Sequence, residues 1–140
     1  MNPQAEKCVM ILDEHLPRGL LANTAAILGI TLGKKMPQMV GADLADQSQS
    51  GHLGIIEFPV PILRGTPETI RGVRQQLCQP GFEELTAVDF SDLAQSCKTY
   101  GEFAQKLART PETSLRYLGI AICGPSKKVN KLTGSMPLLG

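Results

Sequence analysis

The sequence predicts an α/β layer fold, in which a four-stranded mixed sheet carries helices on both faces within a single domain, residues 1–140. Extended apolar segments alternate along the chain with segments of helical periodicity, an order typical of layered α/β domains. A length of 140 residues fits one domain with its own core. The second extended segment contains Pro59 and Pro61, which cannot donate to a ladder and therefore place it at an edge.

The first strand and the first helix follow from patterns of apolar residues. Residues 7–12 form a continuous apolar run, as in a strand that is buried on both faces. After a turn at 16–19, residues 20–32 place leucine and alanine at helical spacing, and Gly33 with two following lysines resembles a helix end. Residues 36–52 are polar and lack periodicity, so we expect a long loop that is either mobile or site-forming.

The middle of the chain predicts an edge strand, a helix and a third strand. Residues 54–63 form the extended segment with the two prolines. The sequence Thr-Pro-Glu at 66–68 is typical of a helix start, because it supplies a hydroxyl cap, a first-turn proline and an acid. That helix stops at Gln-Pro-Gly, 79–81, and the third strand follows at 85–90.

The last third of the chain predicts three helices and one strand. A short helix occupies residues 91–97, and Thr99 with Glu102 forms a capping box at the start of the next. Residues 115–123 are mostly apolar and indicate a central strand. The final helix covers residues 126–132.

The balance of charges excludes several function classes. A formal net charge of +1 provides no overall field for nucleic acid or an anionic membrane. No run approaches the roughly 18 apolar residues of a membrane span, and the first residues do not resemble a signal peptide. We therefore expect a cytoplasmic protein without a membrane partner.

The four cysteines are far apart in the sequence and form no CxxC pair. The expectation is four reduced, mostly buried thiols, and the alternative is that one of them is reactive. No nucleotide-binding glycine motif is present, and we predict neither a cofactor nor a metal site.

Acidic candidates stand at strand ends, where ligands bind in open α/β sheets. Asp13 and His15 follow the first strand and suit acid/base work or part of a metal site; the alternative is solvated turn charges. Asp89 lies inside an apolar strand, as a base or as a structural cap for N–H groups at 91–93.

Basic candidates gather at the last helix. Gly124 leads into a helix start that suits an anion, and Lys127, Lys128 and Lys131 add positive charge there. This region is the best candidate for contact with a phosphate or an acidic ligand, and the alternative is a solvated basic face.

Two segments resemble the type-two peptidyl-tRNA hydrolases. Residues 13–28, DEHLPRGLLANTAAIL, follow an apolar strand, and residues 124–139, GPSKKVNKLTGSMPLL, contain the ending Lys131-Leu132-Thr133-Gly134. From about residue 7 to 139 the chain is more similar to an uncharacterised bacterial family related to that hydrolase, the domain of unknown function two thousand. The shared features are Val88-Asp89-Phe90, Tyr117-Leu118-Gly119, Gly124-Pro125 and Asn130 to Gly134. The resemblance implies the hydrolase-like fold.

The departures from the hydrolase pattern concern its active residues. Leu20 stands at the position of a lysine important for activity, and Ile27 at that of a histidine. Arg18 is the basic counterpart of an earlier lysine, whereas residues 107–113 lack the family's Asp and Gly. A leucine cannot stabilise a developing oxyanion, so the resemblance implies a relative that does not hydrolyse.

The sequence leaves three hypotheses for the function, of which the first is favoured. The first is a non-hydrolytic protein that binds a small anionic ligand or an RNA end such as tRNA, through Arg18, Asn23, Gly124, Lys127 and Lys131. The second is a hydrolase of a peptidyl or acyl ester with a rearranged site that uses one of the acidic candidates or His15 as its base. The third is an oligomerisation module, as a homodimer, whose surface is the proline-edged strand with residues 36–40.

Overall fold

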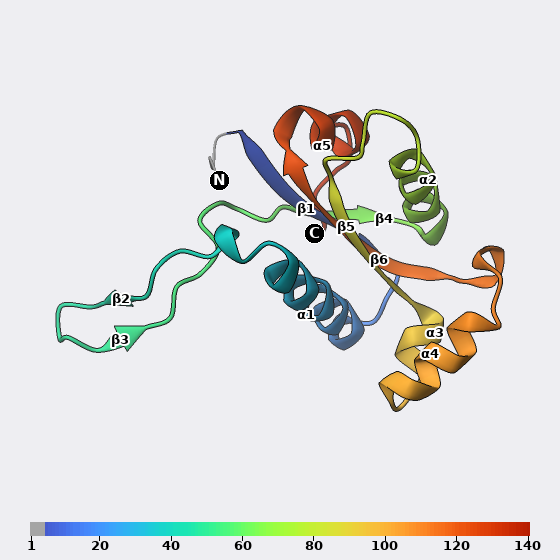
Figure 1. Ribbon diagram of the computed structural model, residues 1–140, viewed down its shortest axis with the longest axis horizontal. Coiled ribbons are helices and arrows are strands. Elements are labelled where there is room, and N and C mark those ends of the chain that lie inside the picture. The colour runs from blue at the N-terminus through green and yellow to red at the C-terminus, as the bar shows by residue number, and fades with distance from the viewer. Residues whose placement is uncertain (1–4) are drawn as a thin grey trace.

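A mixed four-stranded sheet forms the centre of the computed structural model, which describes residues 5–140 (Figure 1). Its order is β4 (Ile62–Gly65), β1 (Glu6–Asp13), β6 (Tyr117–Pro125) and β5 (Thr86–Ser91). β1 pairs parallel with β4 and antiparallel with β6, which pairs antiparallel with β5. The predictions of a mixed sheet, of central first and last strands and of an edge position for the second are confirmed.

One helix, α1 (Arg18–Lys35), covers one face of the sheet. Its buried Leu28 and Leu32 pack on alternate residues of β1, namely Cys8, Met10 and Leu12. The helix is longer at both ends than the predicted range 20–32, because a glycine and two lysines continue the helix instead of ending it.

Two helices, α2 (Pro67–Leu77) and α5 (Ser126–Thr133), cover the opposite face. The other alternate residues of β1, Val9 and Ile11, pack there with Ile70, Val73 and Val129. Burial of both strand faces explains why the apolar run of β1 is continuous rather than alternating. The prediction of helices on both faces is confirmed.

Side-chain caps start the remaining helices, α3 (Asp92–Ser96) and α4 (Tyr100–Ala108). Ser91 Oγ accepts the Ala94 N–H at 3.3 Å, and Thr99 Oγ1 accepts the Glu102 N–H at 3.1 Å. The predicted capping box is half formed, since the Glu102 carboxylate accepts the N–H of Lys98 at 3.3 Å instead of that of Thr99. A 3₁₀ turn, η2 (Glu112–Ser114), leads into β6.

The predicted strand at 54–63 is wrong in its position. The strand that joins the sheet is 62–65, and both prolines precede it. The Pro61 carbonyl still accepts the Met10 N–H at 3.0 Å, so the prolines end the pairing with β1 at this point. A residue without an N–H limits the ladder here, which is why the edge strand is short.

The predicted loop at 36–52 contains ordered pairing. It begins with the 3₁₀ turn η1 (Pro37–Met39) and continues into the hairpin of β2 (Leu44–Ala45) and β3 (Gly51–His52). We call residues 40–56 the arm, because they extend away from the body of the molecule (Figure 1). The Asp46 carboxylate holds the turn by accepting the N–H groups of Ser48 and Ser50 at 2.9 and 3.1 Å.

The end of the chain lies along the outer side of β4. The Leu139 N–H donates to the Ile62 carbonyl at 2.9 Å, and the Arg64 N–H donates to the Pro137 carbonyl at 3.0 Å. These bonds satisfy backbone groups that an edge strand otherwise exposes.

Candidate functional site

A cleft of about 430 Å³ opens beside the edge strand β5. Helix α1 forms one wall and helices α3 and α4 form the other. A volume of this size lies in the range of small-molecule sites, which is about 300–1,000 Å³. The lining residues are Ile27 and Thr31 of α1, residues 88–91 of β5, and Ala94, Cys97, Lys98, Thr99, Tyr100 and Phe103.

The cleft exists because α3 and α4 turn away from the sheet after β5. The Ser91 cap sets the start of α3. The Asp92 N–H donates to the Arg116 carbonyl at 2.9 Å, so this turn is held against the residue that precedes β6. The Asp92 carboxylate in turn accepts the Arg116 N–H at 3.0 Å. Two helices are thereby held at the end of β5 instead of on top of the sheet.

The floor of the cleft is apolar and its polar groups are few. Val88 and Phe90 of β5 contribute to the same core cluster as Ile27 of α1. Ser91 is buried, and its hydroxyl oxygen is occupied as a helix cap. Lys98 supplies a cation at an exposed position of the lining. This arrangement suits binding of an apolar group with an anionic end, since it offers contact area and one charge.

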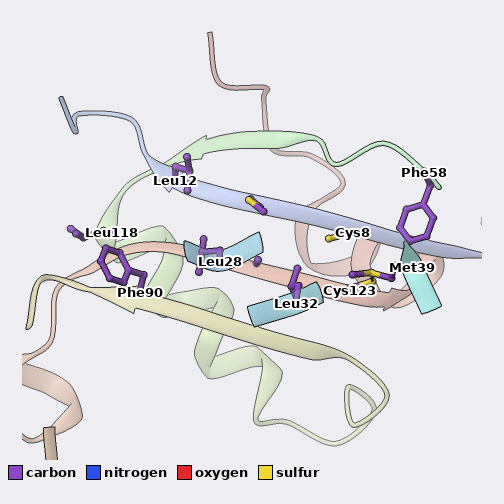
Figure 2. Close-up of a cluster of buried hydrophobic side chains, with 11 residues drawn as sticks. Cys8, Leu12, Leu28, Leu32, Met39, Phe58, Phe90, Leu118 and Cys123 are labelled. Carbon is purple, nitrogen blue, oxygen red and sulfur yellow. Dashed lines mark hydrogen bonds between the residues drawn. The ribbon is translucent and has the colours of Figure 1, made fainter. Parts of the chain in front are cut away.

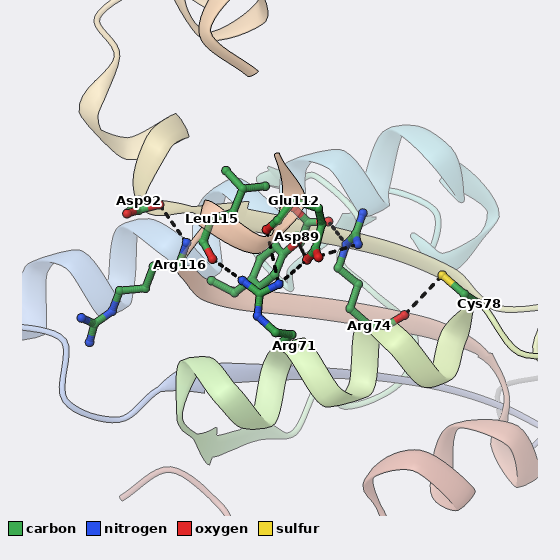
Figure 3. Close-up of polar contacts among 9 residues, drawn as sticks. Arg71, Arg74, Cys78, Asp89, Asp92, Glu112, Leu115 and Arg116 are labelled. Carbon is green, nitrogen blue, oxygen red and sulfur yellow. Dashed lines mark hydrogen bonds and ion pairs between the residues drawn. The ribbon is translucent and has the colours of Figure 1, made fainter. Parts of the chain in front are cut away.

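Asp89 borders the cleft, but its carboxylate is engaged on the opposite face of the sheet. Its Oδ2 accepts from Arg74 Nε of α2 at 3.3 Å (Figure 3). The predicted role as a cap for N–H groups at 91–93 is wrong, because Ser91 caps α3. Because the Asp89 carboxylate points toward α2, it cannot act as a base for a ligand in the cleft.

A polar cluster that the sequence did not predict lies on the α2 face (Figure 3). Glu112 Oε2 accepts from Arg71 Nη1 at 2.6 Å and from the Tyr117 hydroxyl at 2.6 Å. The Arg71 and Arg74 guanidinium carbons lie 5.1 and 5.6 Å from the centre of the Tyr117 ring. Arg71 also donates to the Leu115 carbonyl, so the cluster fastens the segment before β6 to α2.

Contacts within this cluster shift the pKa values of Tyr117 and Glu112. Burial, helped by the hydrogen bond to Glu112, raises the pKa of Tyr117 to about 12. The tyrosine hydroxyl and then the two guanidinium groups lower the pKa of Glu112. Partners far apart in the sequence form this cluster, so no local motif could have indicated it.

The first acidic candidate lies at the end of β1. Asp13 is only 1% exposed, and its Oδ1 accepts the His15 backbone N–H at 3.1 Å. Its Oδ2 lies 3.7 Å from Arg116 Nη2, so Arg116 connects Asp13 with Asp92. Because β1 and β5 both run antiparallel to β6, the end of β1 at Asp13 and the end of β5 at Ser91 lie at the same edge of the sheet.

The predicted ligand contacts do not come together. Arg18 and Asn23 are exposed on the first turns of α1, at the end of β1 marked by Asp13. Gly124 pairs with Lys7 at the opposite end of β1. Lys127 and Lys131 stand on α5, which covers the other face of the sheet. One small ligand therefore cannot contact both groups.

The lysines of α5 have a local partner. Lys128 Nζ and Lys131 Nζ lie 5.8 and 6.0 Å from the centre of the Phe82 ring. The first N–H of α5, that of Ser126, already donates to the Ala5 carbonyl at 2.8 Å. The basic end of this helix is therefore partly engaged by the chain itself.

The thiols are free among the described residues, and two of them are buried. Cys8 and Cys123 lie in the core, whereas Cys97 is half-buried and Cys78 is exposed. The expectation of mostly buried thiols is thus wrong for Cys78, which follows the last turn of α2. Within residues 5–140, no three histidine, cysteine or acidic side chains come together as a metal site.

Comparison with known proteins establishes the family. The model of a family described as a protein of unknown function (DUF2000) matches residues 6–140. The chain belongs to this family. No curated protein matches it.

A solved structure from the same comparison shares the fold. A protein of unknown function from Agrobacterium tumefaciens strain C58 is similar with a TM-score of 0.86 over 100% of both chains, at 16% sequence identity. The two chains therefore share a fold although most of their residues differ. In the part of the chain described, each helix is too short or too polar to span a membrane.

Proposed function

We propose that this protein binds a small ligand with an apolar body and an anionic end in the cleft beside β5, and does not hydrolyse it. The observation that carries the proposal is the cleft itself, with a volume of about 430 Å³, an apolar floor and Lys98 on its lining. An RNA end is a poorer fit than a small molecule, because nucleic acid requires several cations along its backbone.

The proposal includes descent from peptidyl-tRNA hydrolase with loss of its chemistry. Leu20 and Ile27, which replace the hydrolase lysine and histidine, are partly buried and pack against the core cluster of α1 and β1. They serve packing, so restoring a charge at Leu20 has to displace apolar contacts. Neither histidine lines the cleft. The four free thiols fit the reducing cytoplasm of a bacterium, which we propose as its location.

Binding is tested with anilinonaphthalene sulfonate, a fluorescent probe that has an apolar body and one anionic group. The variant Ala94→Phe fills the cleft, and Ala104→Phe places the same ring on an exposed position of α4. We expect Ala94→Phe to reduce the saturable fluorescence at least fivefold and Ala104→Phe to leave it unchanged. Lys98→Met should weaken binding of the probe without abolishing it. Equal fluorescence in both phenylalanine variants would contradict the proposal.

Absence of hydrolysis is tested with N-blocked aminoacyl-tRNA. We expect no turnover by the wild type, measured as release of the blocked amino acid. Turnover that disappears in Asp13→Asn or His15→Gln, with the melting temperature preserved, would favour the alternative hydrolase with a rearranged site. Leu20→Lys serves as a probe of whether the ancestral charge alone is sufficient.

The arm favours a second candidate function, assembly into a homodimer. Leu44, Leu53 and Ile55 are 71%, 83% and 79% exposed on it. A hairpin of two-residue strands is marginal alone, and a second copy supplies both the apolar cover and the missing backbone partners. Sedimentation of the wild type and of Leu53→Asp tests this: a dimer that the variant converts to a monomer supports it, and a monomeric wild type refutes it.

A further inference from the structure

Three sulfur atoms meet in the core at the base of the arm. Cys8 of β1 and Cys123 of β6 are direct partners in the antiparallel register. Met39 of η1 closes over them, with its Sδ 3.3 Å from Cys123 Sγ. Figure 2 shows the three side chains gathered at one end of the apolar cluster. All three residues are at most 3% exposed.

A small cavity adjoins this sulfur group. Its volume is about 190 Å³, and its lining includes Cys8 and Met39 together with Met10 and Leu32. The cavity also touches Val40 and Ile56, the first and last residues of the arm, which pair with each other. Apolar side chains thus line a space, open to solvent on one side, that lies between these sulfur-containing side chains and the base of the arm.

Sulfur ligands in apolar surroundings select particular metal ions. Thiolate and thioether groups favour monovalent copper, whereas magnesium, calcium and manganese prefer oxygen. Sulfur atoms about 2.3 Å from a common metal lie roughly 3.8–4.0 Å from one another. The Cys123–Met39 separation of 3.3 Å is near that spacing, and the cavity that Cys8 and Met39 line gives these two side chains room for a small outward movement.

We propose that Cys8, Cys123 and Met39 bind one Cu⁺ ion per chain. On binding, the two thiol protons leave to solvent, two copper–thiolate bonds form, and the Met39 thioether supplies the third ligand. Neither copper nor sulfur changes its oxidation state. A structural zinc ion is a poorer fit, because it takes four ligands and no group of three histidine, cysteine or acidic side chains is present within residues 5–140. The inference does not rest on the proposed function of the cleft.

The test is a competition titration of reduced protein with Cu⁺ under anaerobic conditions, with bicinchoninate as the coloured chelator. The exposed Cys78 and the half-buried Cys97 are replaced first in the variant Cys78→Ser/Cys97→Ser, so that only the buried pair of thiols remains. We expect this variant to withhold one Cu⁺ per chain and to gain ultraviolet absorption from copper–thiolate bonds. Adding Cys8→Ala or Cys123→Ala should abolish both signals, and Met39→Leu should weaken the affinity tenfold or more.

The near-ultraviolet circular dichroism spectrum of each variant serves as the control for correct folding. Met39→Leu nearly conserves the side-chain volume, so this variant should fold like the wild type. Copper should also raise the melting temperature of the background variant, because it binds only the folded site. The proposal is refuted if that background withholds no copper, or if Cys8→Ala and Cys123→Ala withhold as much as it does.

Discussion

Replacing Gly119 by alanine should push helix α1 away from the sheet. Gly119 lies in β6 beneath α1, and a Cβ atom there meets Thr24 Cγ2 at 2.7 Å, Leu12 Cδ2 at 2.8 Å and Leu28 Cδ1 at 3.1 Å. All three neighbours are buried, so none can move into solvent. Because α1 also forms a wall of the cleft, the shift should alter that cleft as well.

The magnitude follows from two opposing effects. Overpacking of a core costs about 1–3 kcal/mol. Alanine lowers the conformational entropy of the unfolded chain relative to glycine, which raises the free energy of unfolding by about 0.4–1 kcal/mol. We therefore expect Gly119→Ala to lower the free energy of unfolding by about 1–2 kcal/mol. With roughly 2 cal/mol/K of unfolding entropy per residue, this corresponds to about 3–7 °C in melting temperature.

The assay is urea and thermal unfolding of a double-mutant cycle. Thr24→Ala removes the nearest clashing methyl group together with a buried hydroxyl that has no hydrogen-bond partner. The double variant Gly119→Ala/Thr24→Ala should therefore be about 1 kcal/mol more stable than the sum of the single effects predicts. Gly72→Ala, in α2 with open space around it, is the matched control and should stabilise by about 0.5–1 kcal/mol. Additive effects, or a Gly119→Ala variant as stable as the wild type, would refute the close packing of α1.

Three further predictions concern the polar contacts. Because burial raises the pKa of Tyr117 to about 12 in the folded state, against about 10 unfolded, its stabilisation is complete below pH 10 and is lost as the pH rises toward 12. Urea unfolding from pH 8 to 11 should therefore show a steeper decline for the wild type than for Tyr117→Phe, by about 1–2 kcal/mol after allowance for solvent screening. The hydrogen bond from His52 and the backbone N–H groups of the turn lower the pKa of Asp46. The protection factors of the Ser48 and Ser50 amides against exchange should consequently fall as the pH drops below about 4, and in Asp46→Ala they should be low at every pH. Arg71→Met should destabilise by about 1–2 kcal/mol in urea unfolding and Arg74→Met by less, since the ion pairs of Arg74 are longer; equal losses would contradict this ranking.

Local chemistry explains what the sequence predicted correctly. The continuous apolar run of β1 and that of β6 indicated strands buried on both faces, and both are central. The Thr66 hydroxyl accepts the Thr69 N–H at 3.1 Å, as its position before a proline predicted. These signals depend on neighbours within a few residues, so one sequence contains them in full.

Pairing between distant segments explains what the sequence did not predict. Strand periodicity does not determine whether β6 runs parallel or antiparallel to β1, and that choice separates Gly124 from Asp13. The direction of Asp89 depends on Arg74, a residue of α2 on the opposite face. The arm was missed because its strands have two residues each, too short for a period to be detected. The cleft arises from the angle at which α3 leaves β5, which no residue pattern encodes.

The pairing of the first strand with the last has a consequence for the synthesis of the chain. Leu12 pairs with Gly119 and Glu6 with Pro125, so the first strand of the domain to be synthesised receives its main partner only from the last strand. Until β6 is made, Ile11 has only the short β4 as a strand partner and Val9 has none. Contacts between such distant segments slow folding and expose apolar surface meanwhile. The domain should therefore fold mostly after its translation is complete, with the nascent first strand as the segment that a chaperone would bind.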